Sequence, residues 1–305
     1  MKVNHNKIFK YYQQGIYPIA NKLYVLGDIH GDFNAFIICL RKAKLIDNKY
    51  HWIGRDSHVV QVGDILDRKI RSLADNNNDE DSEFKIISLI CNLQLEAYIA
   101  GGGFHPIIGN HELMNILGIF DYVSPMGLKH FKTVEERYNY FKIGGIFCKY
   151  LACAWNPVIK IGDFIFCHGG LNVDISNKYS INDINYIMRD TLYGNKKHIG
   201  MSYFSELFLN NDSILWNRTY SSDLGKFREF KEEKNLKKIL NNYEVKYMVV
   251  GHTPTESGIK TRFNGQVLCA DTGMSEAFGY KKNKNDRIHY IEIISNSSEN
   301  KIILH

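Results

Sequence analysis

Proline and long apolar runs are both scarce in this sequence. The 305 residues include five prolines, and no Pro-rich linker, internal repeat or low-complexity tract is present. No stretch approaches the roughly 20 consecutive apolar residues of a membrane-spanning helix, and the segment 1–20 lacks the continuous apolar run of a secretory signal. From these absences we expect a cytoplasmic protein with no membrane partner.

A CxxC motif is also missing, and neither sign of charge dominates. The six cysteines are scattered along the chain, four of them inside expected core elements. This is typical of reduced thiols that pack as small apolar residues. The formal net charge is +5 with both signs interspersed, which gives little reason to expect nucleic acid as a partner.

Hydrophobic periodicity indicates an α/β fold. Over the first third of the chain, short apolar segments typical of buried strands alternate with amphipathic helical patterns. The strands are expected at 23–26, 59–62 and 106–108, and the helices at 33–45 and 83–100. This order favours a sheet flanked by helices. Four later segments predict the strands of a second sheet: 164–167, 247–250, 267–270 and 289–294. The polar run 75–81 is expected to be a solvated loop.

Five polar clusters share one placement, because each directly follows a predicted strand. In α/β sheets, ligand sites gather at the carboxyl ends of strands, so five such loops would converge on one crevice. The clusters are Asp28 with His30, Asp64 with Asp67 and Arg68, Asn110 with His111, His168, and His252.

The donor atoms of this set are oxygen and imidazole nitrogen, with no thiolate. Such donors favour divalent ions such as Mn, Fe or Zn. The set holds more ligands than one ion needs, and Asp64 is the economical choice for a carboxylate that bridges two ions. Two ions a few ångströms apart suit the attack of a metal-bound hydroxide on phosphorus.

In this order and strand context, the clusters resemble the calcineurin-like metallophosphoesterases, and within them the phosphoprotein phosphatases. The resemblance spans roughly residues 20–295 and is greatest to the Shewanella-like protein phosphatases of bacteria, plants and protists. The stretches that carry it are 95–103 (LEA…GGG), 109–115 (GNHELMN), 250–255 (VGHTPT) and 271–275 (DTGMS). It implies a four-layer αββα sandwich of two mixed sheets, and we expect a single domain over 1–305 with its catalytic core at about 20–295.

The resemblance also implies a role for each clustered residue. One metal would be held by Asp28, His30 and Asp64, and the other by Asp64, Asn110, His168 and His252. His111 matches the general acid, and Asp67 matches the aspartate that orients it. Arg68, Asn110 and Arg218 match groups that bind the substrate phosphate.

Four departures from the family pattern bear on specificity. Lys69 stands where a glycine is usual, and Ile108 replaces a common arginine. The stretch 271–275 stands in place of the SAPNYC segment of typical Ser/Thr phosphatases, which leaves strict Ser/Thr preference open. Pro254 replaces the second histidine of the Gly-His-x-His motif, which disfavours phosphodiester hydrolysis.

The expected function is therefore dinuclear-metal-dependent hydrolysis of phosphomonoesters, with a phosphoprotein as substrate. Phosphoserine and phosphothreonine are the expected groups, and phosphotyrosine is a further candidate. One alternative is hydrolysis of small phosphoesters or dinucleoside polyphosphates. A second is an inactive scaffold that keeps the fold to bind a partner, although such a protein has no physical need for a costly buried polar cluster.

Overall fold

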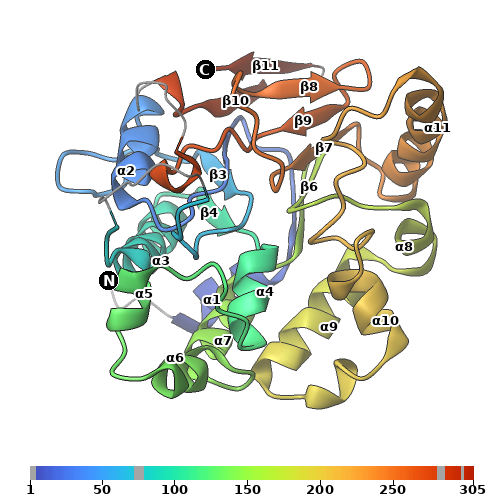
Figure 1. Ribbon diagram of the computed structural model, residues 1–305. Helices are drawn as coiled ribbons and strands as arrows, with labels where there is room; N and C mark the ends of the chain where they lie inside the picture. Colours follow the sequence, from blue (N-terminus) through green and yellow to red (C-terminus); the bar gives the residue numbers. More distant parts are fainter. Residues whose placement is uncertain (1–4, 72–78, 280–285, 297–298) are drawn as a thin grey trace.

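Two mixed β-sheets lie face to face at the centre of the protein (Figure 1). The computed structural model describes residues 5–71, 79–279, 286–296 and 299–305. The five-stranded sheet has the order β11 (Asn300–Leu304), β10 (Tyr290–Ser295), β2 (Lys22–Leu26), β3 (His58–Gln61), β4 (Gly103–Pro106). The six-stranded sheet has the order β1 (Ile16–Tyr17), β5 (Val158–Ile161), β6 (Phe164–Cys167), β7 (Tyr247–Val250), β9 (Val267–Cys269), β8 (Lys260–Arg262).

The strands that precede the polar clusters run parallel within each sheet. β2, β3 and β4 pair in parallel, with Leu26 opposite Gln61 and Gln61 opposite Pro106. β6 and β7 pair in parallel in the other sheet. Parallel neighbours end at the same edge of their sheet, so the loops after these strands start side by side.

The core between the sheets is built by side chains that alternate along each strand. Val25 and Val60 of one sheet belong to the same buried cluster as Phe166 and Val249 of the other. Their neighbour Leu26 faces the opposite side and packs in the cluster under the helices. Both faces of these central strands are therefore buried, which explains their nearly continuous apolar composition.

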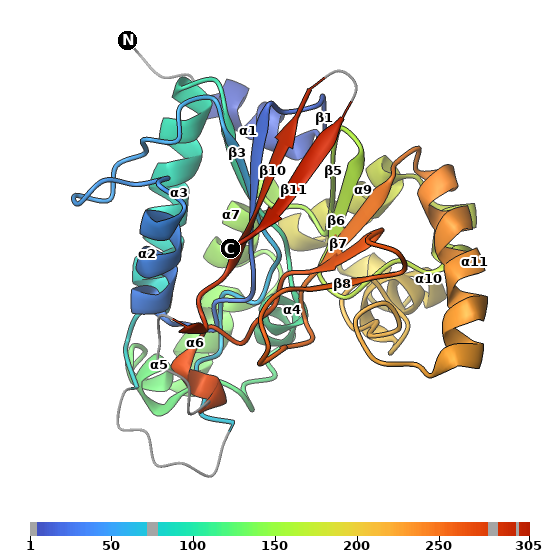
Figure 2. The same cartoon turned by 90° about the horizontal axis from the view of Figure 1, so that it is seen from above.

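Helices cover the outer face of each sheet (Figure 2). α2 (Phe33–Lys42) and α3 (Glu83–Ile99) lie against the five-stranded sheet, and α9 (Ile181–Tyr193) and α11 (Lys226–Asn242) against the other. α8 (Val173–Lys178) packs against α11. This confirms the four-layer αββα sandwich. The remaining α-helices are α1 (His5–Gln13), α4 (Asn110–Ile116), α5 (Pro125–Lys129), α6 (Val134–Phe141), α7 (Ile146–Ala154) and α10 (Ser202–Phe204).

The main difference from the sequence prediction concerns the last predicted strand. We expected it in the second sheet, but β10 pairs antiparallel with β2 and so returns to the first sheet. Smaller differences are that α2 ends at Lys42 and that β4 begins at Gly103, earlier than the predicted 106–108. Most of the predicted loop at 75–81 lies outside the described residues.

The cysteines and the helices agree with the remaining expectations from composition. All six cysteines are free, and the four buried ones are Cys39, Cys148, Cys167 and Cys269. Across the described ranges, no helix combines the length and the apolar character needed to cross a membrane.

One buried carboxylate ties together the loops after β3 and β4. Glu112, in the first turn of α4, accepts hydrogen bonds from the backbone N–H groups of Asp64 and Gly109 at its Oε2, at 2.9 and 2.8 Å. Its Oε1 accepts from Ile65 and Leu66 at 2.9 and 3.1 Å. The loops approach so closely that a Cβ on Gly109 would lie 2.3 Å from Asp64 Oδ1. Only glycine fits there, and the Glu112 carboxylate fixes the position of Asp64.

We expect Glu112→Gln to destabilise the protein, because the amide NH₂ would face two backbone N–H donors and leave both unsatisfied. Two buried unsatisfied donors cost about 2–5 kcal/mol, measurable by urea unfolding. Glu135→Gln, at an exposed position of α6, is the control and should stay within about 0.5 kcal/mol of wild type. Equal stability of the two variants would contradict the bracing role.

Candidate active site

A cavity of about 310 Å³ contains most of the residues that the sequence singled out. It is lined by His30, Asp64, Arg71, Asn110, His111, Met114, Tyr122, Trp216, Arg218, His252, Pro254, Asp271 and Phe278. Two further predicted residues, Asp28 and His168, are buried and contact lining residues directly. Asp67 is likewise outside the lining and contacts His111, whereas Arg68 is outside the lining and forms an ion pair with Asp32.

Three electron-pair donors converge beside the cavity. His168 Nε2 lies 2.8 Å from Asn110 Oδ1 and 3.2 Å from Asp64 Oδ2. The other ring nitrogen, Nδ1, donates a hydrogen bond to the Val62 carbonyl at 2.7 Å. In the neutral imidazole Nε2 therefore carries a lone pair that faces two oxygen atoms. A cation at this point would satisfy all three donors.

His30 and Asp28 form a second group next to the first. His30 Nε2 lies 3.7 Å from Asp64 Oδ2 and 4.0 Å from Asp28 Oδ2. Its Nδ1 lies 3.1 Å from the Leu66 carbonyl, which orients the ring so that Nε2 points to the carboxylates. A carbonyl that holds the far ring nitrogen is the usual support of a histidine ligand.

Several buried polar atoms at the site have no hydrogen-bond partner among the described residues. They are the electron-pair donors Asp28 Oδ1, His252 Nε2 and Asp271 Oδ2, together with the N–H donor Trp216 Nε1. Buried polar groups are normally paired, so unpaired electron-pair donors in one site call for a ligand. The unpaired oxygen and nitrogen atoms of Asp28, His252 and Asp271 therefore fit bound metal ions.

The pKa shifts of Asp28, Asp271, His30 and His252 agree with this fit. Burial, together with the carboxylates of Asp271 and Asp64, raises the pKa of Asp28 well above its usual range, and burial raises the pKa of Asp271 to about 6. These carboxyls therefore lack compensating positive charge. Burial also lowers the pKa of His30 and of His252, which keeps both imidazoles neutral, the form that binds metals.

The positions of the donor atoms define two overlapping groups. One consists of Asp64, His168 and His252, and the other of His30, Asp64 and His111. Both contain Asp64, as expected of a bridging carboxylate. The second includes His111, whose Nε2 lies 3.8 Å from Asp64 Oδ2, a distance like that of His30. Position alone therefore does not separate a ligand role of His111 from an acid role.

The hydrogen bonds of His111 distinguish it from the other histidines. Its Nδ1 lies 2.7 Å from Asp67 Oδ2, which fixes the ring and leaves Nε2 toward the cavity. Asp67 Oδ1 accepts from Asn115 Nδ2 at 2.8 Å, and Asn115 Oδ1 accepts from Nε and Nη2 of Arg137 at 3.1 and 2.7 Å. Asn115 and Arg137 are fully buried, and sequence reasoning assigned neither of them a role.

The arginines occupy different environments. Arg218 lines the cavity and donates through Nη1 to the His252 carbonyl and to Thr253 Oγ1, at 2.5 and 3.1 Å. The side chain of Arg68 is only 3% exposed, and Nη1 lies 3.2 Å from Asp32 Oδ2. Arg71, which sequence reasoning did not single out, lines the cavity instead. Arg71 lies three residues after Arg68 and belongs to no motif, so no signal in the sequence indicated that it lines the cavity.

Left-handed backbone conformations recur at the predicted site. Four of its non-glycine residues have left-handed φ angles: His30 at 42°, Asp64 at 53°, Asp67 at 72° and His252 at 66°. Such conformations are uncommon for residues with a Cβ and gather at functional sites. Here they turn side chains from successive strand ends toward one point.

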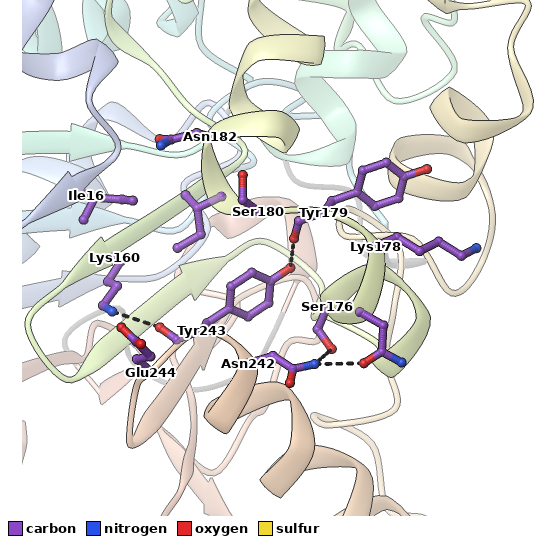
Figure 3. Close-up of a pocket in the computed structure, with 12 residues that line it drawn as sticks. Ile16, Lys160, Ser176, Lys178, Tyr179, Ser180, Asn182, Asn242, Tyr243 and Glu244 are labelled. Carbon is purple, nitrogen blue, oxygen red and sulfur yellow. Dashed lines mark hydrogen bonds between the residues drawn. The ribbon is translucent and has the colours of Figure 1, made fainter.

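A second hollow, of about 390 Å³, lies between β1, α8 and the end of α11 (Figure 3). Tyr243 and Asn242 occupy its wall, where the Tyr243 hydroxyl donates to the Tyr179 carbonyl and Lys160 Nζ donates to the Tyr243 carbonyl. Its lining residues, all of them described, include no histidine and a single carboxylate, Glu244. It therefore lacks the donors of the first cavity.

Comparisons with known proteins agree with this geometry. A family model described as calcineurin-like phosphoesterase matches residues 22–256. The chain is 35% identical over 257 residues to Shewanella-like protein phosphatase 1 of Plasmodium berghei (strain Anka), covering 83% of this chain and 67% of that protein. It is 27% identical over 297 residues to Shewanella-like protein phosphatase 2 of Arabidopsis thaliana, covering 84% and 72%.

Among solved structures, a cold-active protein tyrosine phosphatase superimposes with a TM-score of 0.75 at 25% identity, over 96% of this chain and 78% of that chain. The family match includes all five strand-end loops that build the cavity. The chain therefore belongs to the calcineurin-like phosphoesterases, a family of hydrolytic enzymes.

Proposed function

We propose that the protein is a phosphomonoesterase that uses two metal ions and acts on phosphoprotein. The observation that carries this proposal is that Asn110 Oδ1 and Asp64 Oδ2 both lie within 3.2 Å of His168 Nε2, next to a histidine held by Asp67. Asp28, His30 and Asp64 would hold one ion, and Asp64, Asn110, His168 and His252 the other. Bound there, Mn, Fe or Zn ions supply a nucleophilic water at neutral pH and neutralise phosphate charge.

The side chains around the ions supply the remaining chemistry. His111 donates a proton from Nε2 to the leaving alkoxide, which is too basic to depart without one. Asp67 accepts from Nδ1 and keeps Nε2 turned toward the cavity. Arg218 grips phosphate oxygens with the guanidinium N–H groups that its hydrogen bonds to His252 and Thr253 leave over. Asn110 contributes to phosphate binding from the same edge.

The cavity walls and the relatives both favour a phosphorylated side chain as substrate. Tyr122, Trp216 and Phe278 give the cavity an aromatic lining that accommodates an aliphatic or aromatic phosphoester. The similar proteins are named protein phosphatases, and the similar solved structure a protein tyrosine phosphatase. We propose phosphoserine and phosphothreonine as substrates, with phosphotyrosine as a further candidate.

Phosphopeptides and p-nitrophenyl phosphate should be hydrolysed in preference to bis-p-nitrophenyl phosphate, because Pro254 lines the cavity where diesterases place a histidine. A missing hydrogen-bonding group costs on the order of tenfold or more in rate. The measurement is kcat/KM on a panel that also includes a dinucleoside polyphosphate. Faster cleavage of the dinucleoside would favour a small-molecule hydrolase, and no cleavage by the metal-loaded protein would favour an inactive scaffold.

Removal of metal should abolish activity and lower the melting temperature, and Mn²⁺ should restore both at least in part. Ions that bind only the folded state stabilise it by about 2.7 kcal/mol per site at 100 times Kd. Asp64→Asn should remove most of the Mn²⁺-dependent shift, whereas Asp174→Asn, at an exposed position of α8, should retain it. Undiminished activity at a confirmed metal content near zero would contradict the proposal.

His111→Asn should separate the proton donor from the ligands. Loss of a general acid typically costs about 10²- to 10⁴-fold in rate. The loss should be large for a phosphoserine peptide and smaller for p-nitrophenyl phosphate, whose leaving group hardly needs a proton. Asp67→Asn should show the same dependence more mildly, because it alters only the orientation of His111.

The decisive measurement for His111 is metal stoichiometry beside kcat on both substrates. Asp64→Asn should lose metal and should lose activity on both substrates together. If His111→Asn loses metal in the same way, then His111 is a ligand, as its 3.8 Å approach to Asp64 allows, and the division of roles is wrong.

A further inference from the structure

We propose that Arg71 is a phosphate-binding residue of this enzyme and that Arg68 serves the structure of the loop. The inference rests on the proposed function, because it assigns the residue that holds the substrate of that same site. Arg71 lines the cavity together with Arg218, so two guanidinium groups face the space in which the phosphate would lie.

The guanidinium of Arg68 is neutralised by its surroundings. Its Nη1 lies 3.2 Å from Asp32 Oδ2, and its Nη2 lies 3.4 Å from Glu80 Oε1 and 3.7 Å from Glu276 Oε2. Nη1 also donates to the Gly31 carbonyl at 3.2 Å. A buried arginine surrounded by three carboxylates has little positive charge left to attract an anion. If the guanidinium turned away toward a substrate, the carboxylates would lose their compensating positive charge.

Arg71 is held in the opposite electrostatic situation. Among the described residues, no carboxylate lies within ion-pair distance of its guanidinium, whereas three carboxylates surround that of Arg68. The Nη2 of Arg71 lies within hydrogen-bond distance of the Asp67 carbonyl at 3.4 Å, His30 Nδ1 at 3.1 Å and His111 Nε2 at 3.4 Å. His30 Nδ1 also faces the Leu66 carbonyl, so it is a poor acceptor for Arg71.

Two aromatic rings fix the guanidinium without using its N–H groups. The Arg71 Cζ lies 4.8 Å from the centre of the Phe278 ring and 5.4 Å from that of Tyr122. The backbone N–H of Arg71 donates to the Ala277 carbonyl at 2.7 Å, which anchors the base of the side chain. Arginine stacked on rings keeps its N–H fork available for a bidentate contact with an anion.

The position relative to His111 identifies the anion. Arg71 Nη2 lies 3.4 Å from His111 Nε2, the atom assigned to protonate the leaving group. A phosphate oxygen bound by Arg71 would lie beside the bond that breaks, where negative charge grows during the reaction. The ligand class is a tetrahedral phosphate monoester dianion or its product, inorganic phosphate.

The test compares Arg71→Ala and Arg71→Lys with Arg68→Lys and the exposed control Arg228→Ala in the Mn²⁺-loaded full chain. Inorganic phosphate is the probe, measured as a competitive inhibitor of p-nitrophenyl phosphate hydrolysis and by calorimetric titration. Arg71→Ala should raise the phosphate Ki and Kd and should lower kcat/KM, each by about 10- to 100-fold, as expected for a lost charge-assisted contact. Arg71→Lys should recover part of the loss.

Arg68→Lys should lower the melting temperature, because lysine cannot replace all the hydrogen bonds of the guanidinium to the loop. The phosphate Kd should stay within about twofold of wild type, because Arg68 does not contact the anion in this proposal. Wild-type phosphate affinity in Arg71→Ala, or higher activity of that variant, would overturn the proposal. A phosphate affinity that depends on Arg68 and not on Arg71 would also overturn it. If the wild-type protein binds phosphate through Arg71 but has no phosphatase activity, the proposed function is wrong and the assignment of Arg71 still holds.

Discussion

The Glu112 carboxylate is the constraint on which the site depends. Its two oxygens accept four backbone N–H groups from the loops after β3 and β4, and these loops carry Asp64, Asn110 and His111. Without it, buried donors at two strand ends would lack partners, and the loops would have no fixed spacing. Because Asp64 contributes to both groups of donor atoms, a shift of its loop would disturb both groups at once.

Two features of the site are energetically unfavourable in the folded protein. Left-handed φ angles at His30, Asp64, Asp67 and His252 cost about 1–2 kcal/mol for each residue with a Cβ. Buried oxygen and nitrogen atoms of Asp28 and His252 also remain unpaired among the described residues. Bound cations would offset the cost of the unpaired atoms. Packing of the two sheets and the helices offsets the cost of the left-handed backbone conformations. Such local cost is expected where geometry is selected for chemistry rather than for stability.

Strand periodicity and the polar residues at strand ends were sufficient to predict the architecture around the site. The layers, the parallel strands and the convergence of His30, Asp64 and Asn110 need only that parallel strands end at one edge. The return of β10 to the first sheet could not be predicted, because the pairing partners of a short apolar strand leave no local signal. The roles of Arg137 and Asn115 were also hidden, because both depend on contacts between α4 and α6 that no spacing along the chain encodes.

The departures from the family pattern have unequal consequences. Ile108 is completely buried in the core, so the missing arginine is replaced by apolar packing and not by another charge. Lys69 donates through Nζ to the Asp121 carbonyl at 2.8 Å and is absent from the residues that line the cavity. Its backbone N–H donates to the Tyr122 carbonyl at 3.0 Å, and Tyr122 is one of the two rings that flank Arg71. The segment after Asp67 thus positions a ring and a guanidinium at the cavity, which joins the altered motif to the proposed phosphate site.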